Sequence, residues 1–435
     1  MSHLRSTAAE LVLEVAKRMA DPAALELTAL DSGGRTPSGE AAGQPMWEPL
    51  SLASGFPGVT LLPAELGHHD RYFRRVAHEY LAAAGKHASH ALAGGLYNGL
   101  AAYSFAAHAA AHGPEDYGLL RSRVDGRTAE FMAGFAGARR TVLADGGHKR
   151  QFHDFDVISG VTGVGRHLLA AGEAAAAQEV LSYVVELVLS QRDDLGEGVP
   201  GWWVDHGMTF EDDTPGGHGN FGLAHGISGP LALLAIAWGN GYRHERVESA
   251  VRKIVSWLQE WQQGDEAGPF WPTGIGLHEL AVGRPHDGSA TRPSWCYGTP
   301  GIANSLRLAG EALGEPDWVR TARSALAGAL SRTTIGLTGP SICHGHAGLL
   351  VVAEAFRHMQ DSDALGQAAD RLAGSLIDSF DSEAPFGFTV IQEATGLRLN
   401  HPGFLDGAVG ILLALWCYAT GAPARSGWDR ALLLA

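Results

Sequence analysis

Two cysteines and one histidine are the residues in this chain whose types and spacing best fit a metal site. Cys296 lies in the run Ser-Trp-Cys-Tyr-Gly, and Cys343 directly precedes His344 in the run Ile-Cys-His-Gly-His. Two thiolates and one imidazole are typical zinc ligands, and three protein ligands leave one position open, as in catalytic zinc sites. The residues therefore predict a zinc site with an exchangeable position. The alternative is a buried, inert cysteine pair beside a hydrogen-bonded histidine.

A zinc ion with an open position can bind and activate an exchangeable ligand, and a thiol is one such ligand. A free thiol has a pKa of about 8.5, and only its thiolate form is nucleophilic. A thiol that binds a metal ion is deprotonated outright. Cys417, the third cysteine of the chain, lies inside an apolar helical pattern, so we expect it to belong to the core.

A short glycine pattern recurs along the chain, and we call each copy a glycine mark. A polar or reactive residue is followed by Gly, two further residues, a second small residue and an Ala/Leu-rich run. These runs are apolar on nearly all sides, which is typical of buried helices. Glycine at the start of such a helix lets a ligand or a neighbouring helix approach closely. The marks begin at Gly99, Gly160, Gly226, Gly298, Gly345 and Gly407.

Amphipathic helices are predicted between the buried ones. Their apolar residues recur at helical spacing, with charged residues on the opposite face. Alternating buried and amphipathic helices predict an all-α fold, an α/α toroid of inner and outer rings that forms one domain over residues 1–435. A linear helical solenoid is the alternative. The amphipathic segments are 72–84, 180–189, 246–261, 318–330 and 365–380.

Long loops are expected over one end of the toroid. The segments 191–220 and 262–294 each run directly into a glycine mark, so both should overhang the same mouth. Long loops of this kind are more often functional than idle. The first contains an acidic turn at Glu211, Asp212 and Asp213. The segment 31–58 is rich in Gly, Pro and Ser, and we interpret it as a mobile segment.

The composition excludes several classes of partner. The net charge of −15 argues against nucleic acid and anionic membranes. Three cysteines argue against a disulfide framework and for a reducing compartment. The first 21 residues mix charged and apolar residues at helical spacing, so we expect no signal peptide. The apolar run 411–418 is too short to span a membrane. We therefore expect a cytoplasmic protein.

Several of these motifs resemble those of the LanC family of lanthipeptide (lantibiotic) cyclases, in its stand-alone form. The resemblance lies in 223–230, 294–301 and 343–348, and also in 156–160 and 404–411. It implies an α/α toroid with zinc held at one end by Cys296, Cys343 and His344. It also implies an enzyme that adds peptide cysteine thiols to dehydroalanine or dehydrobutyrine, forming lanthionine and methyllanthionine thioether rings.

The resemblance also implies roles for four further residues. His225 is the candidate acid or base that moves the proton of the thiol or of the enolate; the alternative is a histidine that caps a helix. Asp156 would orient His225, or else serve as a helix N-cap. Arg292 would stabilise enolate charge, or pair with a loop carboxylate. Tyr297 would hydrogen-bond at the site, or pack in the core.

The expected partners are a precursor peptide whose Ser and Thr are already dehydrated and a separate dehydratase. A membrane-associated synthetase and transporter complex is left open, although the chain shows no membrane segment of its own. Two other functions also stay open at this point. One is a LanC-like protein that adds glutathione or another thiol intermolecularly, and the other is a non-catalytic zinc scaffold that binds peptides.

Overall fold

Helices dominate the computed structural model, which describes residues 3–37, 42–146, 149–207, 214–286, 288, 290–332, 337, 339–357, 363–392 and 395–435. The chain divides into two compact units. Unit 1 comprises Met1–Arg127 and Leu337–Asp429, and unit 2 comprises Thr128–Gly336 and Arg430–Ala435. The boundary falls within the long helix α6 (Gly118–Ala144). None of the helices in the described residues combines the length and apolar composition needed to cross a membrane.

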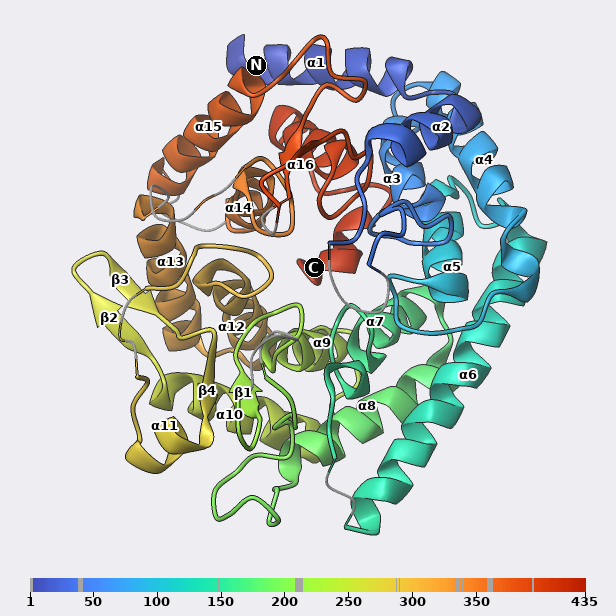
Figure 1. Ribbon diagram of the computed structural model, residues 1–435. Coiled ribbons are helices and arrows are strands. Elements are labelled where there is room, and N and C mark those ends of the chain that lie inside the picture. The colour runs from blue at the N-terminus through green and yellow to red at the C-terminus, as the bar shows by residue number, and fades with distance from the viewer. Residues whose placement is uncertain are drawn as a thin grey trace. The chain divides into compact units, whose positions relative to one another are not determined.

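Unit 1 packs nearly fully buried helices against amphipathic ones. In Figure 1, α14 and α16 lie on the inner side of α15 and α1. The amphipathic α4 packs on α3 and α5, and the amphipathic α15 packs on α14 and α16, so each of these buried helices has an amphipathic partner. The buried helices are α3 (Phe56–Leu66), α5 (Gly99–Ala110), α14 (His346–Ala355) and α16 (Ala408–Thr420). The others are α1 (His3–Arg18), α2 (Pro22–Ser32), α4 (Arg71–Gly85) and α15 (Asp363–Asp378), with the short η1 (Ala88–His90).

Unit 2 repeats this arrangement. The buried helices contact one another in chain order, α7 against α9 and α9 against α12. The helix that follows each one in sequence packs against it. The buried helices are α7 (Val161–Ala171), α9 (Ser228–Gly239) and α12 (Thr299–Leu313). Their partners are α8 (Ala174–Leu189), α10 (Glu245–Glu260) and α13 (Pro316–Ser331). The predicted alternation of buried and amphipathic helices is therefore confirmed.

The glycines of the marks are required by close backbone packing. A Cβ atom on Gly301 would lie 2.1 Å from the carbonyl oxygen of Trp295, and one on Gly410 would lie 2.0 Å from that of Phe404. Each carbonyl belongs to the loop directly before the helix, six residues earlier. Real Cβ atoms do not approach so closely, so glycine lets each loop fold back against the first turn of its own helix. The approach that we expected from a ligand or a neighbouring helix is made here by the chain's own loop.

One buried helix escaped the sequence analysis. The segment 31–58, interpreted as mobile, ends in the run Gly55-Phe-Pro-Gly58, a further glycine mark that starts α3. A Cβ atom on Gly58 would lie 2.1 Å from the oxygen of Leu52, as at the other marks. The mobility of 31–58 stays a prediction, and its residues 38–41 lie outside the described residues, as do Glu211, Asp212 and Asp213 of the predicted acidic turn. The single domain also stays a prediction.

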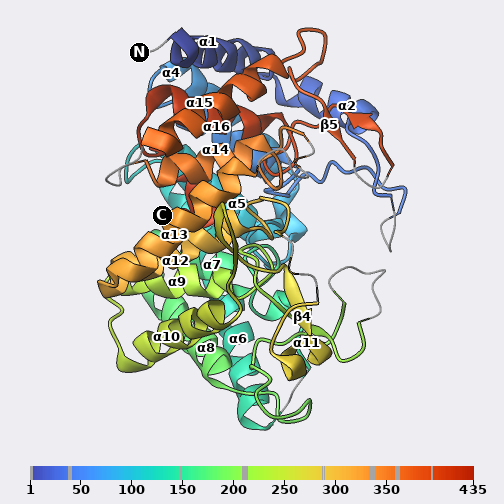
Figure 2. The ribbon, with the colours of Figure 1, turned by 90° about the vertical axis from the view of Figure 1, so that its left-hand side faces the viewer.

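The long loops of unit 2 carry short antiparallel strands. β1 (His218–Asn220) pairs with β4 (Gly274–Gly276), with His218 opposite Gly276. β2 (Gln263–Asp265) pairs with β3 (Gly268–Phe270), and the short helix α11 (Leu277–Val282) follows β4. In unit 1, β5 (Val390–Ile391) pairs with β6 (Arg398–Leu399). Figure 2 shows α11 directly beside β4. The segment 262–294 is thus more regular than we expected.

Candidate metal and acid–base site

In unit 2, backbone hydrogen bonds join the loops that precede the buried helices. The amide of Val157 donates to the carbonyl of Ala224 at 2.9 Å, and the amide of Ala224 donates to the carbonyl of Cys296 at 3.0 Å. Ala224 and Cys296 each lie two residues before the first glycine of a mark. These bonds place the loop of Asp156, the loop of His225 and the loop of Cys296 side by side.

Unit 1 joins its loops in the same way. The amides of Ile342 and Cys343 both donate to the carbonyl of Leu405, at 3.1 and 3.0 Å. Leu405 lies two residues before Gly407, as Cys343 lies two residues before Gly345. The loop of Cys343 and His344 is therefore fixed to the loop that contains Asp406.

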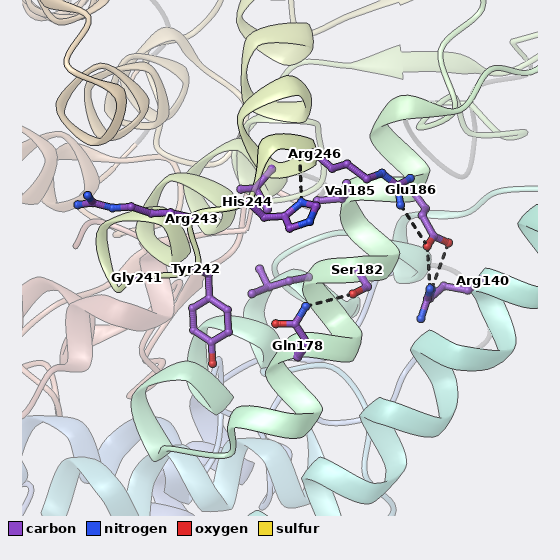
Figure 3. A pocket seen from close by; sticks show the side chains of 12 residues that line it. Arg140, Gln178, Ser182, Val185, Glu186, Gly241, Tyr242, Arg243, His244 and Arg246 are labelled. Carbon is purple, nitrogen blue, oxygen red and sulfur yellow. Dashed lines mark hydrogen bonds and ion pairs between the residues drawn. The ribbon is translucent and has the colours of Figure 1, made fainter.

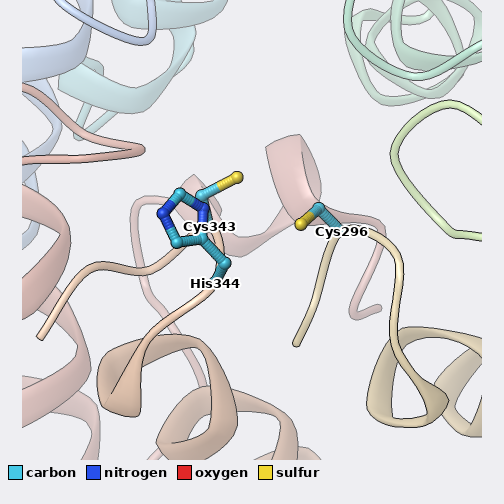
Figure 4. A group of neighbouring side chains, drawn as sticks. All are labelled: Cys296, Cys343 and His344. Carbon is cyan, nitrogen blue, oxygen red and sulfur yellow. The ribbon is translucent and has the colours of Figure 1, made fainter. Parts of the chain in front are cut away.

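The predicted ligands lie in these loops. Cys296 of unit 2 is buried, and its Sγ lies 3.6 Å from Oγ of Ser294. Cys343 and His344 of unit 1 are half-buried. Among the described residues, Cys296, Cys343 and His344 make up one of two groups that could hold a metal ion (Figure 4). Since this group alone offers two thiolates, its donor set suits zinc.

Asp406 and Tyr97 lie near the candidate ligands of unit 1, and the sequence analysis assigned neither residue a role. Nδ1 of His344 lies 3.8 Å from Oδ1 of Asp406. Burial raises the pKa of Tyr97 well above its usual value, and the charge of the nearby Cys343 thiolate adds to the rise. Tyr97 therefore stays a neutral phenol. Its place two residues before Gly99 matches that of Cys343 before Gly345, and this was the signal that could have found it.

His225 and Asp156 form a close pair in unit 2. Nδ1 of His225 lies 2.5 Å from Oδ2 of Asp156, whose side chain is fully buried. A carboxylate only accepts hydrogen bonds, so Nδ1 carries the proton and Nε2 is the nitrogen that can exchange one. The other oxygen, Oδ1, accepts from the amides of Gly160 at 2.5 Å and Ser159 at 2.8 Å. Asp156 thus contacts His225 and closes the turn before α7. The alternative of a helix N-cap is wrong, because Gly160 is the N-cap of α7 and the helix has no side-chain cap; the role of Asp156 toward His225 stays a prediction.

Aromatic rings hold the plane of His225. The centroid of its ring lies 5.1 Å from that of Phe152 and 5.6 Å from that of Tyr297, and the angles between the ring planes are 34° and 29°. Phe152 also contacts the rings of His206, at 4.6 Å, and His218, at 5.6 Å. No spacing signal in the sequence distinguishes Phe152, because its role depends on which loops meet.

The remaining cysteine and arginine are placed as follows. Arg292 is half-buried in the loop before Cys296, and its carbonyl oxygen lies 2.4 Å from where a Cβ atom on Gly298 would be. Its role toward enolate charge stays a prediction. Cys417 lies in α16, and burial raises the pKa of its thiol. Cys417 is half-buried rather than fully buried, so its place in the core stays a prediction.

A separate cavity of about 440 Å³ lies in unit 2 beside α6, α8 and the start of α10 (Figure 3). Three of its polar side chains, Arg140, Glu186 and His244, already have structural partners. The guanidinium of Arg140 donates to Glu186 at 2.8 Å and to Glu179 at 3.1 Å. Nδ1 of His244 accepts from the amide of Arg246 and caps α10. This cavity follows the C-terminal end of α9, whereas the His225 loop precedes the N-terminal end of that helix.

The comparisons with known proteins agree with this construction. The chain is 26% identical over 396 residues to the nisin biosynthesis protein NisC of Lactococcus lactis subsp. lactis, covering 88% of this chain and 89% of that protein. The solved structure of nisin cyclase matches with a TM-score of 0.74 at 23% identity, over 88% of this chain and 92% of that one. This match confirms the predicted fold class, the all-α toroid. The family described as lanthionine synthetase C-like protein matches residues 46–433, and the chain belongs to this family.

Proposed function

We propose that this protein is a zinc-dependent lanthipeptide cyclase. It adds cysteine thiols of a dehydrated precursor peptide to dehydroalanine or dehydrobutyrine, and so forms thioether rings. The observation that carries the proposal is the hydrogen bond between the amide of Ala224 and the carbonyl of Cys296. This bond supports the proposal because it joins the loop of Cys296, a proposed zinc ligand, to the loop of His225, the proposed source of the proton.

The three proposed zinc ligands are Cys296, Cys343 and His344. The donor set fits the ion, because two thiolates and one imidazole leave a fourth position for an incoming thiol. When bound, zinc supplies a Lewis acid that lowers the pKa of a coordinated peptide thiol. Ser294, whose hydroxyl lies 3.6 Å from Sγ of Cys296, helps to fix the position of that ligand.

His225 handles the proton of the reaction. The peptide thiolate forms a carbon–sulfur bond at the β-carbon of the dehydro residue, and the alkene electron pair moves toward the carbonyl as an enolate. Nε2–H of the imidazolium then donates its proton to the α-carbon, which completes the ring. That proton reaches His225 in the earlier step, in which neutral Nε2 accepts the proton that the thiol loses. The same proton thus leaves sulfur and arrives at carbon, and the addition loses no atoms.

Asp156 and the aromatic rings keep His225 ready for both states. The carboxylate accepts from Nδ1–H and stabilises the imidazolium, as an acidic partner does for a catalytic histidine. The rings of Phe152 and Tyr297 restrict rotation of the imidazole. We propose that Arg292, in the loop of Cys296, stabilises the negative charge of the enolate.

The proposed setting of the reaction is the cytoplasm, with a separate dehydratase supplying the peptide. NisC is a nisin biosynthesis protein by its name, which supports a peptide of that class as the substrate here. Dehydration must precede ring formation, since the alkene that accepts the thiol arises by loss of water from Ser or Thr.

The test is ring formation on a synthetic peptide that contains dehydroalanine, dehydrobutyrine and cysteine. Because cyclisation leaves the mass of the peptide unchanged, each remaining thiol is labelled with an alkylating reagent and counted by mass spectrometry. Zinc-loaded protein should remove alkylatable thiols faster than buffer or metal-free protein does. His225→Asn should abolish this gain, whereas His244→Asn, on the helix cap of α10, should leave it unchanged.

Two results would overturn the proposal. A glutathione adduct without rings, when glutathione is added, would favour intermolecular thiol addition. Zinc-loaded protein that binds the peptide but accelerates neither ring formation nor glutathione addition would favour a non-catalytic peptide-binding scaffold.

A further inference from the structure

We propose that a second cavity of unit 2 binds a peptide segment in which an acidic residue stands next to an apolar one. This inference rests on the proposed function for the nature of the partner, a precursor peptide, and it names a part of that peptide outside the ring-forming residues. The cavity has a volume of about 640 Å³. Its walls are the loop 191–202, α10 and the short helix α11.

One cationic side chain, Lys253 of α10, is found in the described lining of this cavity. Its Nζ donates to the carbonyl oxygen of Ser190 at 3.1 Å and lies 5.7 Å from the ring centroid of Trp202. Burial lowers the pKa of Lys253, because taking the ammonium out of water disfavours its charged form. A carboxylate in the cavity would restore the lost stabilisation, since an opposite charge nearby favours the charged form. This wall therefore favours an anionic group.

Two carboxylates also line the cavity, and neither is paired with Lys253. Glu197 of the loop and Glu260 of α10 are both exposed, so water and salt screen their charges. Among the described residues no ion pair joins Lys253 to a carboxylate, and burial is the cause of its lowered pKa. The ammonium can therefore pair with a carboxylate of the ligand.

Other parts of the lining are apolar. Trp202 and Trp257 are buried and stand edge to face, with their ring centroids 5.7 Å apart. Leu277 and Leu280 of α11 also line the cavity. None of the residues of α11 is buried, and both leucines remain partly exposed to water. An apolar side chain that enters the cavity would remove these leucines from water, which favours binding.

A strand ladder connects the cavity to the proposed acid–base pair. Leu277 directly follows Gly276, which is paired with His218 across β4 and β1. The ring centroid of His218 lies 5.6 Å from that of Phe152, which in turn lies 5.1 Å from that of His225. One compact unit thus carries both the cavity and the proposed proton source. We therefore assign the cavity to the peptide that reacts beside His225.

The experiment measures the binding of three synthetic hexapeptides to the full chain by isothermal titration calorimetry. The peptides contain neither cysteine nor a dehydro residue, and their central pairs are Leu-Asp, Leu-Asn and Ala-Asp. We expect the Leu-Asp peptide to bind about 10-fold more tightly than the Leu-Asn peptide, because a hydrogen bond between two charged groups is stronger than one to a neutral amide. It should also bind about 10-fold more tightly than the Ala-Asp peptide, because leucine buries more apolar surface than alanine.

Two variants, each with a matched control, locate the site. Lys253→Met keeps the aliphatic stem and should abolish the preference for Asp over Asn, whereas Lys17→Met, at an exposed position of α1, should keep it. Leu280→Ala should reduce the preference for Leu over Ala at least about 3-fold, whereas Leu119→Ala, at a position of α6 that is 81% exposed, should not. Urea unfolding checks that each variant is folded.

The outcomes separate this inference from the proposed function. Absence of saturable binding, or a preference for Asp that survives Lys253→Met, would overturn the binding site. The hexapeptides form no rings and need no zinc, so failure of the cyclase proposal would leave their binding unchanged. Conversely, ring formation on the longer test peptide without binding of the hexapeptides would refute the cavity alone.

Discussion

The substitution Asp156→Asn tests the proposed acid–base pair most directly. Oδ1 of Asp156 accepts from the amides of Gly160 and Ser159, so the amide oxygen of asparagine must take that place to keep the turn closed. The NH₂ group then faces Nδ1 of His225, where Oδ2 lay at 2.5 Å. Two donors cannot face each other, so the imidazole must adopt the tautomer with its proton on Nε2.

The expected loss is large in rate and small in stability. A histidine in the wrong tautomer, without an anionic partner, costs up to about 10⁴-fold in turnover in a comparable triad, and we expect a fall of at least ~10²-fold here. The turn keeps its acceptor, so the free energy of unfolding should change by less than about 1 kcal/mol. Asp156→Ala removes that acceptor as well and should cost about 1–3 kcal/mol in addition to the rate.

The assay measures ring formation by loss of alkylatable thiols, zinc content by elemental analysis and stability by urea unfolding. Full zinc content with a rate reduced at least ~10²-fold is the expected result for Asp156→Asn. A rate equal to that of the wild type would refute the role of the pair. Loss of zinc together with the rate would instead place Asp156 in the support of the metal site.

Three further predictions concern the metal, the glycine marks and pH. Cys343→Ala should lose stoichiometric zinc by elemental analysis and ring formation with it, while circular dichroism stays helical. Gly301→Ala places a methyl group 2.1 Å from the oxygen of Trp295 and should lower the free energy of unfolding, measured in urea, by about 1–3 kcal/mol. The control is Gly239→Ala in α9, whose methyl group meets no atom within 4 Å. This change should raise the free energy of unfolding by roughly 0.5–1 kcal/mol. Burial lowers the pKa of His401 to about 4, so as pH falls from about 6.5 the unfolded chain gains a proton before the folded one does. The free energy of unfolding, measured in urea, should therefore fall between pH 6.5 and 4. In His401→Asn it should fall less steeply over the same range.

Local patterns predicted the helices because burial leaves a periodic record in the sequence. The run from Arg246 to Trp261 has one apolar face and became the amphipathic α10, whereas the segment after Gly407 is apolar all round and became the buried α16. α3 was missed although its residues have the same character, since proline, serine and glycine before it favoured an irregular interpretation. The short strands were missed because three-residue ladders such as β1 with β4 are too short for an alternating pattern.

The types of the reactive residues were determined by the sequence, and their partners were decided by the tertiary structure. Cysteine and histidine beside a glycine mark are recognisable as candidate ligands wherever the loop folds. That Asp156 contacts His225 across 69 residues, that Asp406 faces His344 and that Phe152 packs on the imidazole depend on hydrogen bonds between loops. Such bonds join backbone amides and carbonyls, which every residue except proline offers alike, so the side chains leave no record of the pairing.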